Sequence, residues 1–180
     1  GTKNARNKLF HNEGNGNFTL VTNSVFSDEL PTYSQAVSWS DYNKDGYPDI
    51  FVSNRFRSNF LYKNNGNGTF TKITAGSIVN DYSSSRGHAW GDYDNDGWQD
   101  LFVVNYEGLN DFLYHNNGNG TFTRILTGPM VNDGQWGASA AWMDYDNNGY
   151  LDLYVSNSTG NKLYYNNGNG VFTLNNSALS

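Results

Sequence analysis

Three short acidic stretches hold most of the side chains in this sequence that could do chemistry. The stretch from Trp90 to Val104, WGDYDNDGWQDLFVV, places carboxylates at alternate positions around Gly97, where the chain must bend sharply. Oxygens that alternate along a tight loop can converge on one point, and carboxylates so close together repel one another unless a cation lies among them. Hard oxygen ligands in this number suit Ca²⁺, which accepts about six to eight oxygens with tolerant geometry.

The same stretch occurs twice more, as WSDYNKDGYPDIFVS from Trp39 and WMDYDNNGYLDLYVS from Trp142. We predict one Ca²⁺ site in each loop. The ligands are Asp41, Asn43, Asp45, the Tyr47 carbonyl and Asp49; Asp92, Asp94, Asp96, the Trp98 carbonyl and Asp100; and Asp144, Asp146, Asn148, the Tyr150 carbonyl and Asp152. The last acid comes at position nine, not at position twelve as in an EF-hand. The second loop has four carboxylates and should bind tightest, whereas Lys44 should weaken the first.

The acidity of the chain belongs mostly to these loops. The 180 residues carry a net charge of −6, and ten of the seventeen acidic residues lie in the three stretches. The remainder is too weakly basic to suggest a nucleic-acid partner. The lack of cysteine excludes disulfide scaffolds and zinc–thiolate sites, and no apolar run approaches the roughly 18 residues of a membrane span. Weak Ca²⁺ sites fill best where calcium is millimolar, which favours a secreted or cell-surface setting.

A second motif repeats with the same period of about 52 residues. It reads LYKNNGNGTFT from Leu61, LYHNNGNGTFT from Leu113 and LYYNNGNGVFT from Leu163, and a fourth copy, LFHNEGNGNFT, begins at Leu9 with no acidic stretch before it. In each whole repeat one strand enters the acidic loop, a compact apolar strand leaves it, and two more flank the NNGNG segment, which suits a hairpin turn. A longer polar linker without helical periodicity leads to the next repeat.

Such repeats predict an all-β fold made of β-propeller blades, each a four-stranded antiparallel sheet. A β-solenoid or a string of hairpin modules is the alternative, but solenoid coils are usually shorter, about 20–30 residues. Trp39, Trp90 and Trp142 recur at one position of the repeat. We therefore expect these three side chains to pack between blades.

The pattern W-x-D-Y-[DN]-x-[DN]-G-x-x-D-[IL]-[FY]-V, followed by LY-x-NNGNG, resembles the FG-GAP and VCBS repeats. The amino-acid sequence of these motifs is most similar to those of bacterial VCBS-repeat proteins and relatives of cartilage acidic protein. The resemblance covers residues 7 to 174. It implies an integrin-α-type β-propeller in which the acidic loop joins the first two strands of a blade and binds Ca²⁺. Propellers of that family usually have seven blades, whereas this chain has three and a half.

We expect a single propeller segment over residues 1–180, with a half blade at 7–24 and whole blades at 36–74, 87–126 and 138–175. An incomplete ring leaves the apolar faces of its terminal blades open, and these faces need burial. The chain is then a fragment of a longer propeller, one of several copies that close a ring, or a protomer of an open assembly. We expect self-association or a missing partner.

Residues that differ between the repeats should carry the individual function. The candidate ligand-binding residues are Trp98, Trp136, Arg55 and Tyr106. The resemblance implies an adhesion or protein-interaction module. The alternative is a lectin that binds carbohydrate in clefts between blades, where repeated weak sites would give multivalency.

No catalytic trio stands out in the sequence. The three histidines have no ligand-like spacing, and the proximity of Ser85 to His88 is read as coincidence. His115 stands where the other repeats have Lys63 and Tyr165, which argues against chemistry at that position. We therefore predict a protein that is not an enzyme.

Overall fold

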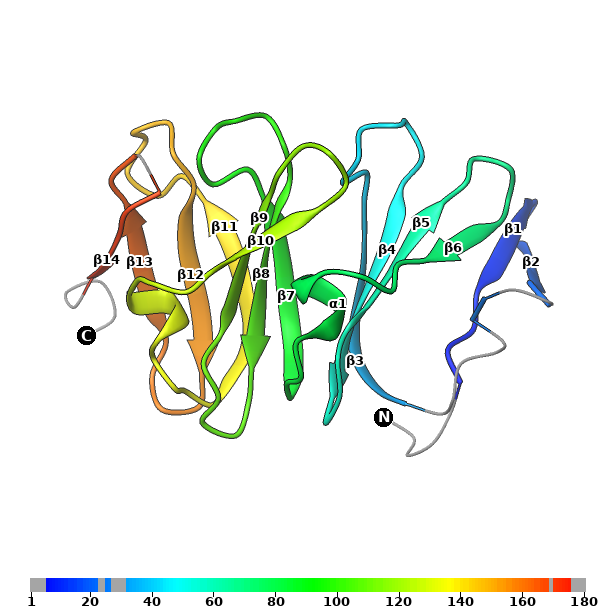
Figure 1. The fold of residues 1–180 in the computed structure, drawn as a ribbon. Helices are drawn as coiled ribbons and strands as arrows, with labels where there is room; N and C mark the ends of the chain where they lie inside the picture. The colour runs from blue at the N-terminus through cyan, green and yellow to red at the C-terminus, as the bar shows by residue number, and fades with distance from the viewer. Residues whose placement is uncertain (1–5, 23–24, 27–31, 169, 176–180) are drawn as a thin grey trace.

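Three antiparallel four-stranded sheets dominate the computed structural model, which describes residues 6–22, 25–26, 32–168 and 170–175. Each sheet is a meander in chain order (Figure 1). The strands are β3 (Tyr33–Ser40), β4 (Asp49–Arg55), β5 (Phe60–Asn64) and β6 (Phe70–Lys72); β7 (Ser85–Gly91), β8 (Asp100–Asn105), β9 (Phe112–Asn116) and β10 (Phe122–Ile125); and β11 (Gly137–Met143), β12 (Asp152–Asn157), β13 (Lys162–Asn166) and β14 (Phe172–Asn175). These sheets are the three whole blades that the repeats predict, and we number them blades 1 to 3.

The N-terminal hairpin forms half a blade. It pairs β1 (Phe10–Gly14) with β2 (Asn17–Leu20) around a turn at Asn15 and Gly16, both with positive φ. These strands correspond to the third and fourth strands of a whole blade. The end at residue 24 that the sequence suggests for this half blade lies outside the described residues.

The second strand of each blade is the buried one. All six residues of β8 are buried, as are the first six of β4. Each of these strands lies inside its sheet, between the first and third strands, and its side chains also meet the neighbouring blade. A continuous apolar run therefore fits this position better than an alternating one.

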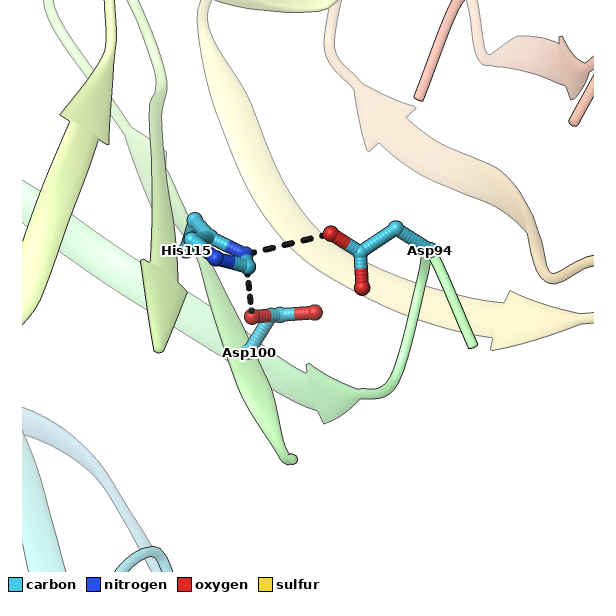
Figure 2. A group of neighbouring side chains, drawn as sticks. All are labelled: Asp94, Asp100 and His115. Atoms are coloured by element: carbon cyan, nitrogen blue, oxygen red, sulfur yellow. Dashed lines mark ion pairs between the residues drawn. The ribbon is translucent and has the colours of Figure 1, made fainter. Parts of the chain in front are cut away.

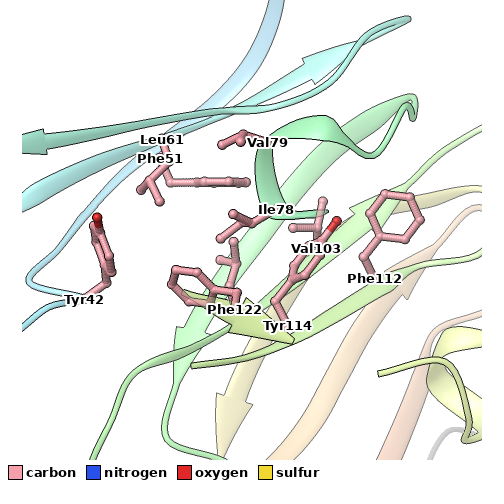
Figure 3. Packing of buried hydrophobic residues seen from close by; sticks show 10 residues of the cluster. Tyr42, Phe51, Leu61, Ile78, Val79, Val103, Phe112, Tyr114 and Phe122 are labelled. Carbon is pink, nitrogen blue, oxygen red and sulfur yellow. The ribbon is translucent and has the colours of Figure 1, made fainter. Parts of the chain in front are cut away.

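Neighbouring blades pack through their faces, and β7 contacts β3 and β4 of blade 1 on one side and β11 of blade 3 on the other. Figure 3 shows the cluster between blades 1 and 2, in which Phe51 and Leu61 of blade 1 face Phe122 of blade 2. A second cluster joins blades 2 and 3. Figure 1 shows the blades side by side, with the half blade beyond blade 1. Separate apolar interfaces between successive sheets are the arrangement expected of a propeller.

The linkers between blades are less polar than predicted. They contain a helical turn, α1 (Ser77–Asn80), and a 3₁₀ turn, η1 (Pro129–Val131). Each turn inserts two buried apolar residues into a blade junction: Ile78 and Val79 from α1, and Met130 and Val131 from η1. A run so short shows no helical periodicity, so these turns could not be predicted from the sequence. No helix among the described residues is long and apolar enough to cross a membrane.

The expectation for the repeated tryptophans is right for two of the three. Trp90 and Trp142 pack against the clusters at the two interior junctions. Trp39 is 53 % exposed. The reason is that the half blade lacks the inner strands on which Trp39 would pack.

Candidate metal centres

Each acidic loop joins the first and second strands of its blade, as the resemblance implies. The loop opens with an aspartate whose Oδ2 accepts a hydrogen bond from the backbone N–H of the glycine five residues later. The N···O distance is 2.9 Å for Gly46 to Asp41, 2.8 Å for Gly97 to Asp92 and 3.0 Å for Gly149 to Asp144. Those glycines have φ near +90°, a backbone conformation that L side chains rarely adopt. The sharp bend and the inward carboxylate therefore come from the same residue pair.

The third and fifth positions form tight turns with their own backbone. In the first loop Asn43 Oδ1 accepts the Asp45 N–H at 3.0 Å, and Asp45 Oδ1 accepts the Tyr47 N–H at 3.0 Å. In the second loop Asp96 Oδ1 accepts the Trp98 N–H at 2.8 Å. Short polar side chains that bond the backbone two residues on favour such turns. Their oxygens are thereby held around the loop.

The ninth position contributes a buried carboxylate. Asp49, Asp100 and Asp152 are at most 1 % exposed. In each, Oδ1 accepts the backbone N–H of the last residue of the third strand, at 2.8 Å from Asn64, 2.7 Å from Asn116 and 2.8 Å from Asn166. These bonds fix the carboxylate between the loop and the sheet.

Burial opposes ionisation of Asp49 and Asp100. It raises the pKa of Asp49 to about 6 and that of Asp100 to about 7, against the backbone hydrogen bonds, which lower it. Neighbouring loop carboxylates raise both values further. A divalent cation among these groups would reverse this balance by favouring the charged forms.

The seventh residue anchors the loop to the hairpin of its own blade. A Cβ placed on Gly66 would come within 2.6 Å of the Tyr47 ring, and one on Gly118 would come within 2.7 Å of Trp98 Nε1. Gly168 and the Tyr150 ring repeat the arrangement, at 2.9 Å. The NNGNG turn must therefore offer a glycine for this aromatic ring to pack on. The role of the Tyr47, Trp98 and Tyr150 carbonyls as metal ligands stays a prediction.

The three loops differ in how closely their carboxylates gather. Asp92, Asp94 and Asp96 of the second loop bring ligand oxygens within 4.8 Å of one another, as do Asp144, Asp146 and Asp152 of the third. Among the described residues the first loop forms no such group.

A lysine lies beside the first loop. Lys63 Nζ is 3.3 Å from Asp45 Oδ2. Together with the hydrogen bond from the Tyr47 N–H, this ammonium holds the pKa of Asp45 below its usual value, although desolvation acts in the opposite direction. Lys44, which the sequence suggests would weaken this loop, extends over the Trp98 ring of the second loop at 4.3 Å, and its effect on metal binding stays a prediction.

The sequence did not indicate that His115 lies beside the second acidic loop. Its Nδ1 lies 3.2 Å from Asp94 Oδ2 and 3.4 Å from Asp100 Oδ1 (Figure 2). The variety of residues at its repeat position argued against chemistry there, but the structure places that position beside the acidic loop in each blade. Lys63 contacts Asp45 of the first loop, and Tyr165 packs against Tyr145 of the third. In the sequence this position is marked only by its place after the LY pair and before an asparagine, and the bond from that asparagine to the ninth-position carboxylate is seen only in the structure.

The acidic loops also take part in the blade junctions. Asn116 Nδ2, at the end of β9, donates to the Tyr42 carbonyl of the preceding blade at 2.8 Å. Asn166 Nδ2 makes the same bond to the Tyr93 carbonyl at 2.7 Å. An ion that ordered the first or second loop would therefore also order the contact with the next blade.

Three of the four predicted ligand-binding residues lie together at the opposite end of the blades. Arg55 ends β4, Tyr106 follows β8 and Trp136 precedes β11. The Arg55 guanidinium lies 5.3 Å from the centre of the Tyr106 ring, whose centre is 4.6 Å from that of Trp136. Trp98 belongs to an acidic loop and is separate from this group. The sequence did not reveal this division because it depends on which ends of the strands each loop joins.

The family of FG-GAP-like repeats matches the chain three times, at residues 1–52, 41–103 and 92–155. Relatives include cartilage acidic protein 1 of Xenopus tropicalis, which is 33 % identical over 112 residues, 61 % of this chain and 17 % of the relative. The mouse protein of that name is 28 % identical over 164 residues, and the human one 26 % identical over 164 residues. Those two alignments cover 86 % of this chain and 25 % of each relative. The chain thus spans about a quarter or less of these relatives.

A solved structure of an Agrocybe aegerita lectin shares the fold. Its title describes specific recognition of non-reducing terminal N-acetylglucosamine. The two structures superpose with a TM-score of 0.60 at 20 % identity, over 93 % of this chain and 46 % of the lectin chain. The repeated sheets and the three family matches agree with one another. The chain belongs to the family of FG-GAP-like repeat proteins and folds as part of a β-propeller.

Proposed function

We propose that this chain is a Ca²⁺-binding, extracellular β-propeller module for adhesion, protein interaction or self-assembly, without catalytic activity. The observation that carries the proposal is the equivalent placement of acidic oxygens in three loops, one at the same strand connection of every whole blade. The residues present fit the ion. Asp49 Oδ2 and Asp92 Oδ1 are buried oxygens without a hydrogen-bond partner, and such orphaned acceptors are what a hard cation satisfies.

The ion would serve the architecture in this proposal. The loops carry few apolar side chains and concentrate carboxylates, so their closed form is stabilised when a cation offsets the repulsion. Because the first and second loops bond to the next blade, the ion would stabilise junctions as well as hairpins. Metal binding that exists only in the folded state adds directly to folding stability.

Calcium titration by isothermal calorimetry on the metal-free chain tests this proposal. We expect up to three sites, with Asp92→Asn, Asp144→Asn and Asp41→Asn each weakening one of them. Asp81→Asn is the matched control, because Asp81 lies outside the loops and pairs with Arg124 at 3.0 Å. Absence of any calcium binding, or equal loss in the control, would contradict the proposal.

The extracellular setting and the interaction role are supported by the relatives and by the exposed blade surfaces. Relatives in three vertebrates carry the name cartilage acidic protein 1, and cartilage is an extracellular matrix. The outer face of blade 3, and the part of blade 1 around Trp39 that the half blade leaves exposed, provide surface for a partner or a second copy. The proposal that the chain has no catalytic activity is supported by the hydrogen bonds of His88, which go to Ser38 and Ser53 and not to Ser85.

A lectin is the second candidate. It is favoured by the group at the opposite end of the blades, where Tyr106 lies between two guanidinium groups, Arg55 at 5.3 Å and Arg86 at 4.3 Å, and meets Trp136 edge-on. Trp136 is 44 % exposed and offers an aromatic face for a sugar ring. The structurally similar protein is a lectin for terminal N-acetylglucosamine.

A glycan array that includes terminal N-acetylglucosamine separates the two candidates. Binding to several related sugars that Trp136→Ala abolishes and Trp98→Ala leaves intact would favour a lectin with its site at this group. Loss with Trp98→Ala alone would place a sugar site at the acidic loops. No binding across the array would favour protein contact or self-assembly.

A further inference from the structure

One position beside the acidic loop differs in every blade. It is the residue after the tyrosine of the third strand, and we call it the loop-facing position: Lys63 in β5, His115 in β9 and Tyr165 in β13. Lys63 brings an ammonium to the first loop and Tyr165 brings a phenol beside the third. His115 alone brings a nitrogen that can act as a metal ligand.

The His115 nitrogen is aimed at the carboxylates but makes no hydrogen bond to them. Nδ1 lies 3.2 Å from Asp94 Oδ2 and 3.4 Å from Asp100 Oδ1, yet it is a buried atom without a hydrogen-bond partner. Asp100 has no solvent-exposed surface. An unprotonated ring nitrogen and two carboxylate oxygens repel one another at such distances, and either a proton on the ring or a bound cation removes that repulsion. Figure 2 shows the three side chains converging from two strands and the loop.

The distances favour a small divalent ion for these three atoms. Bonds of about 2.0–2.1 Å to imidazole nitrogen and carboxylate oxygen, as Zn²⁺ forms, place neighbouring tetrahedral ligands about 3.3–3.4 Å apart. The nitrogen-to-oxygen distances of 3.2 Å and 3.4 Å are close to this separation, and all three ligand atoms lie within 4.8 Å of one another. The other ring nitrogen, Nε2, is 3.9 Å from Asp96 Oδ2. That distance is too long for a hydrogen bond, so Asp96 would have to move closer to orient the ring as carboxylates do in many zinc sites.

We propose that the second loop is a mixed nitrogen–oxygen site in which His115, Asp94 and Asp100 bind Zn²⁺ or a chemically similar first-row metal ion. The first and third loops offer oxygen only and favour Ca²⁺, and Lys63 weakens the first. Imidazole favours later first-row metals over Ca²⁺, whereas carboxylates alone do not. This inference rests on the proposed function, because it assigns a second metal to one of the same loops.

The test compares His115→Tyr, which places the third blade's residue in the second blade, with the unchanged chain. Zn²⁺ and Ca²⁺ affinities are measured by calorimetry on metal-free protein, and Co²⁺ serves as a coloured probe of coordination. We expect His115→Tyr to weaken Zn²⁺ and Co²⁺ binding by about tenfold or more, the loss typical of altered metal-site partners. Ca²⁺ binding should change by less than about threefold, because oxygen ligands dominate it.

A second measurement needs no variant of the site. In the ¹⁵N spectrum of the unchanged chain, one equivalent of Zn²⁺ should shift the Nδ1 resonance of His115 and leave that of His88 in place. His11→Gln is the control for surface binding, since His11 is largely exposed near Glu13. Unchanged Zn²⁺ affinity in His115→Tyr, or an unshifted His115 ring, would overturn the inference.

The two proposals fail separately. Three Ca²⁺ sites with no role for His115 in Zn²⁺ binding would leave the proposed function standing and remove this inference. Zn²⁺ binding that requires His115, in a chain that binds no Ca²⁺, would do the reverse.

Discussion

The interior blade junctions and the open edges of this molecule contain the same residues in different surroundings. Tyr42 and Tyr93, at the second position of the first two acidic loops, are 2 % and 6 % exposed, whereas Tyr145 of the third loop is 50 % exposed. Trp39 at the other edge is 53 % exposed, although Trp90 and Trp142 are partly buried. This difference shows that each blade supplies the side chains of one side of a junction, and that these side chains are buried only where a neighbouring blade supplies the other side.

The junction between blades 2 and 3 shows what the neighbour provides. The Trp142 ring stacks on Tyr93 at 6.2 Å and meets Phe102 edge-on at 6.2 Å. Trp142 Nε1 donates to the Ala89 carbonyl at 3.1 Å. A side chain on Gly91 would come within 2.6 Å of that ring. At the open edge Trp39 meets Phe70 at 6.2 Å beside a hollow of ≈ 370 Å³ lined partly by Leu9 and Phe26.

The largest expected effect comes from removing the same side chain at the two places. Trp142→Ala should lower the free energy of unfolding by about 3 kcal/mol, the low end for loss of a packed tryptophan. Trp39→Ala should lower it by less than about 1 kcal/mol, as for most exposed positions. Urea denaturation monitored by circular dichroism measures both. Equal losses would show that Trp39 is packed in solution, and they would contradict the difference between the interior junction and the open edge.

Calcium removal should have the second-largest effect, because it lowers the stability of the interior junctions. At 100 times the dissociation constant one bound ion adds about 2.7 kcal/mol to the free energy of unfolding. Adding EDTA should therefore lower the midpoint of thermal unfolding, and Asp92→Asn should remove part of that shift because its loop bonds to Asn166 of blade 3 through the Tyr93 carbonyl. An identical EDTA shift in Asp144→Asn and in the unchanged chain would show that the third loop, which no further blade covers, adds nothing.

The junction between blades 1 and 2 should weaken in acid through His88. Its Nε2 lies 2.5 Å from Ser38 Oγ and its Nδ1 2.7 Å from Ser53 Oγ. Burial lowers the pKa of His88 to about 4, against about 6.5 in an unfolded chain. A depressed histidine pKa contributes stability that is present above the unfolded value and lost as pH falls from 6.5 towards 4.

We expect this loss to be about 2 kcal/mol between pH 7 and pH 4.5. Urea denaturation across this range measures it, and His88→Gln should have a flatter dependence because glutamine does not titrate. His11→Gln is the control at an exposed position. The same slope in His88→Gln and the unchanged chain would assign the acid sensitivity to other groups.

Calcium affinity at the second loop should depend on pH through Asp100. Burial raises the pKa of this carboxyl to about 7 in the metal-free protein, so binding must displace a proton below that pH. Affinity should rise about tenfold from pH 6 to pH 8, equivalent to about 1.4 kcal/mol. Calorimetry in buffers of different ionisation enthalpy would reveal the released proton. An affinity that is flat over this range would show that Asp100 is ionised before the metal arrives.

The smallest expected free-energy effect is that of self-association through the open edges. If they associate, light scattering should show a multimer in calcium that loosens in EDTA, and Trp39→Ser should lower its mass. Tyr82→Ser is the control, because Tyr82 is 70 % exposed and lies outside these edges. A monomer at every concentration would argue against self-closure, and a missing partner would remain to cover the edges.

Much of the fold could be predicted because the chain repeats. Alternation of apolar runs, NNGNG turns and acidic loops at one period leaves few arrangements other than stacked four-stranded sheets. The pattern also identified Asp49, Asp100 and Asp152 as related residues, and the structure gives all three the same hydrogen bond to the third strand. The buried pairs of α1 and η1 escaped prediction because one helical turn is too short to show a period.

The number of whole blades, the strand order within each blade and the chemical character of the loops follow from the amino-acid sequence alone, because these depend on local pattern. Only the tertiary structure decided which neighbours complete them. It placed His115 beside Asp94 and Asp100, gathered Arg55, Tyr106 and Trp136, and left Trp39 exposed. Those outcomes depend on contacts between residues far apart in the chain, and identical residues in a repeat differ only through such contacts.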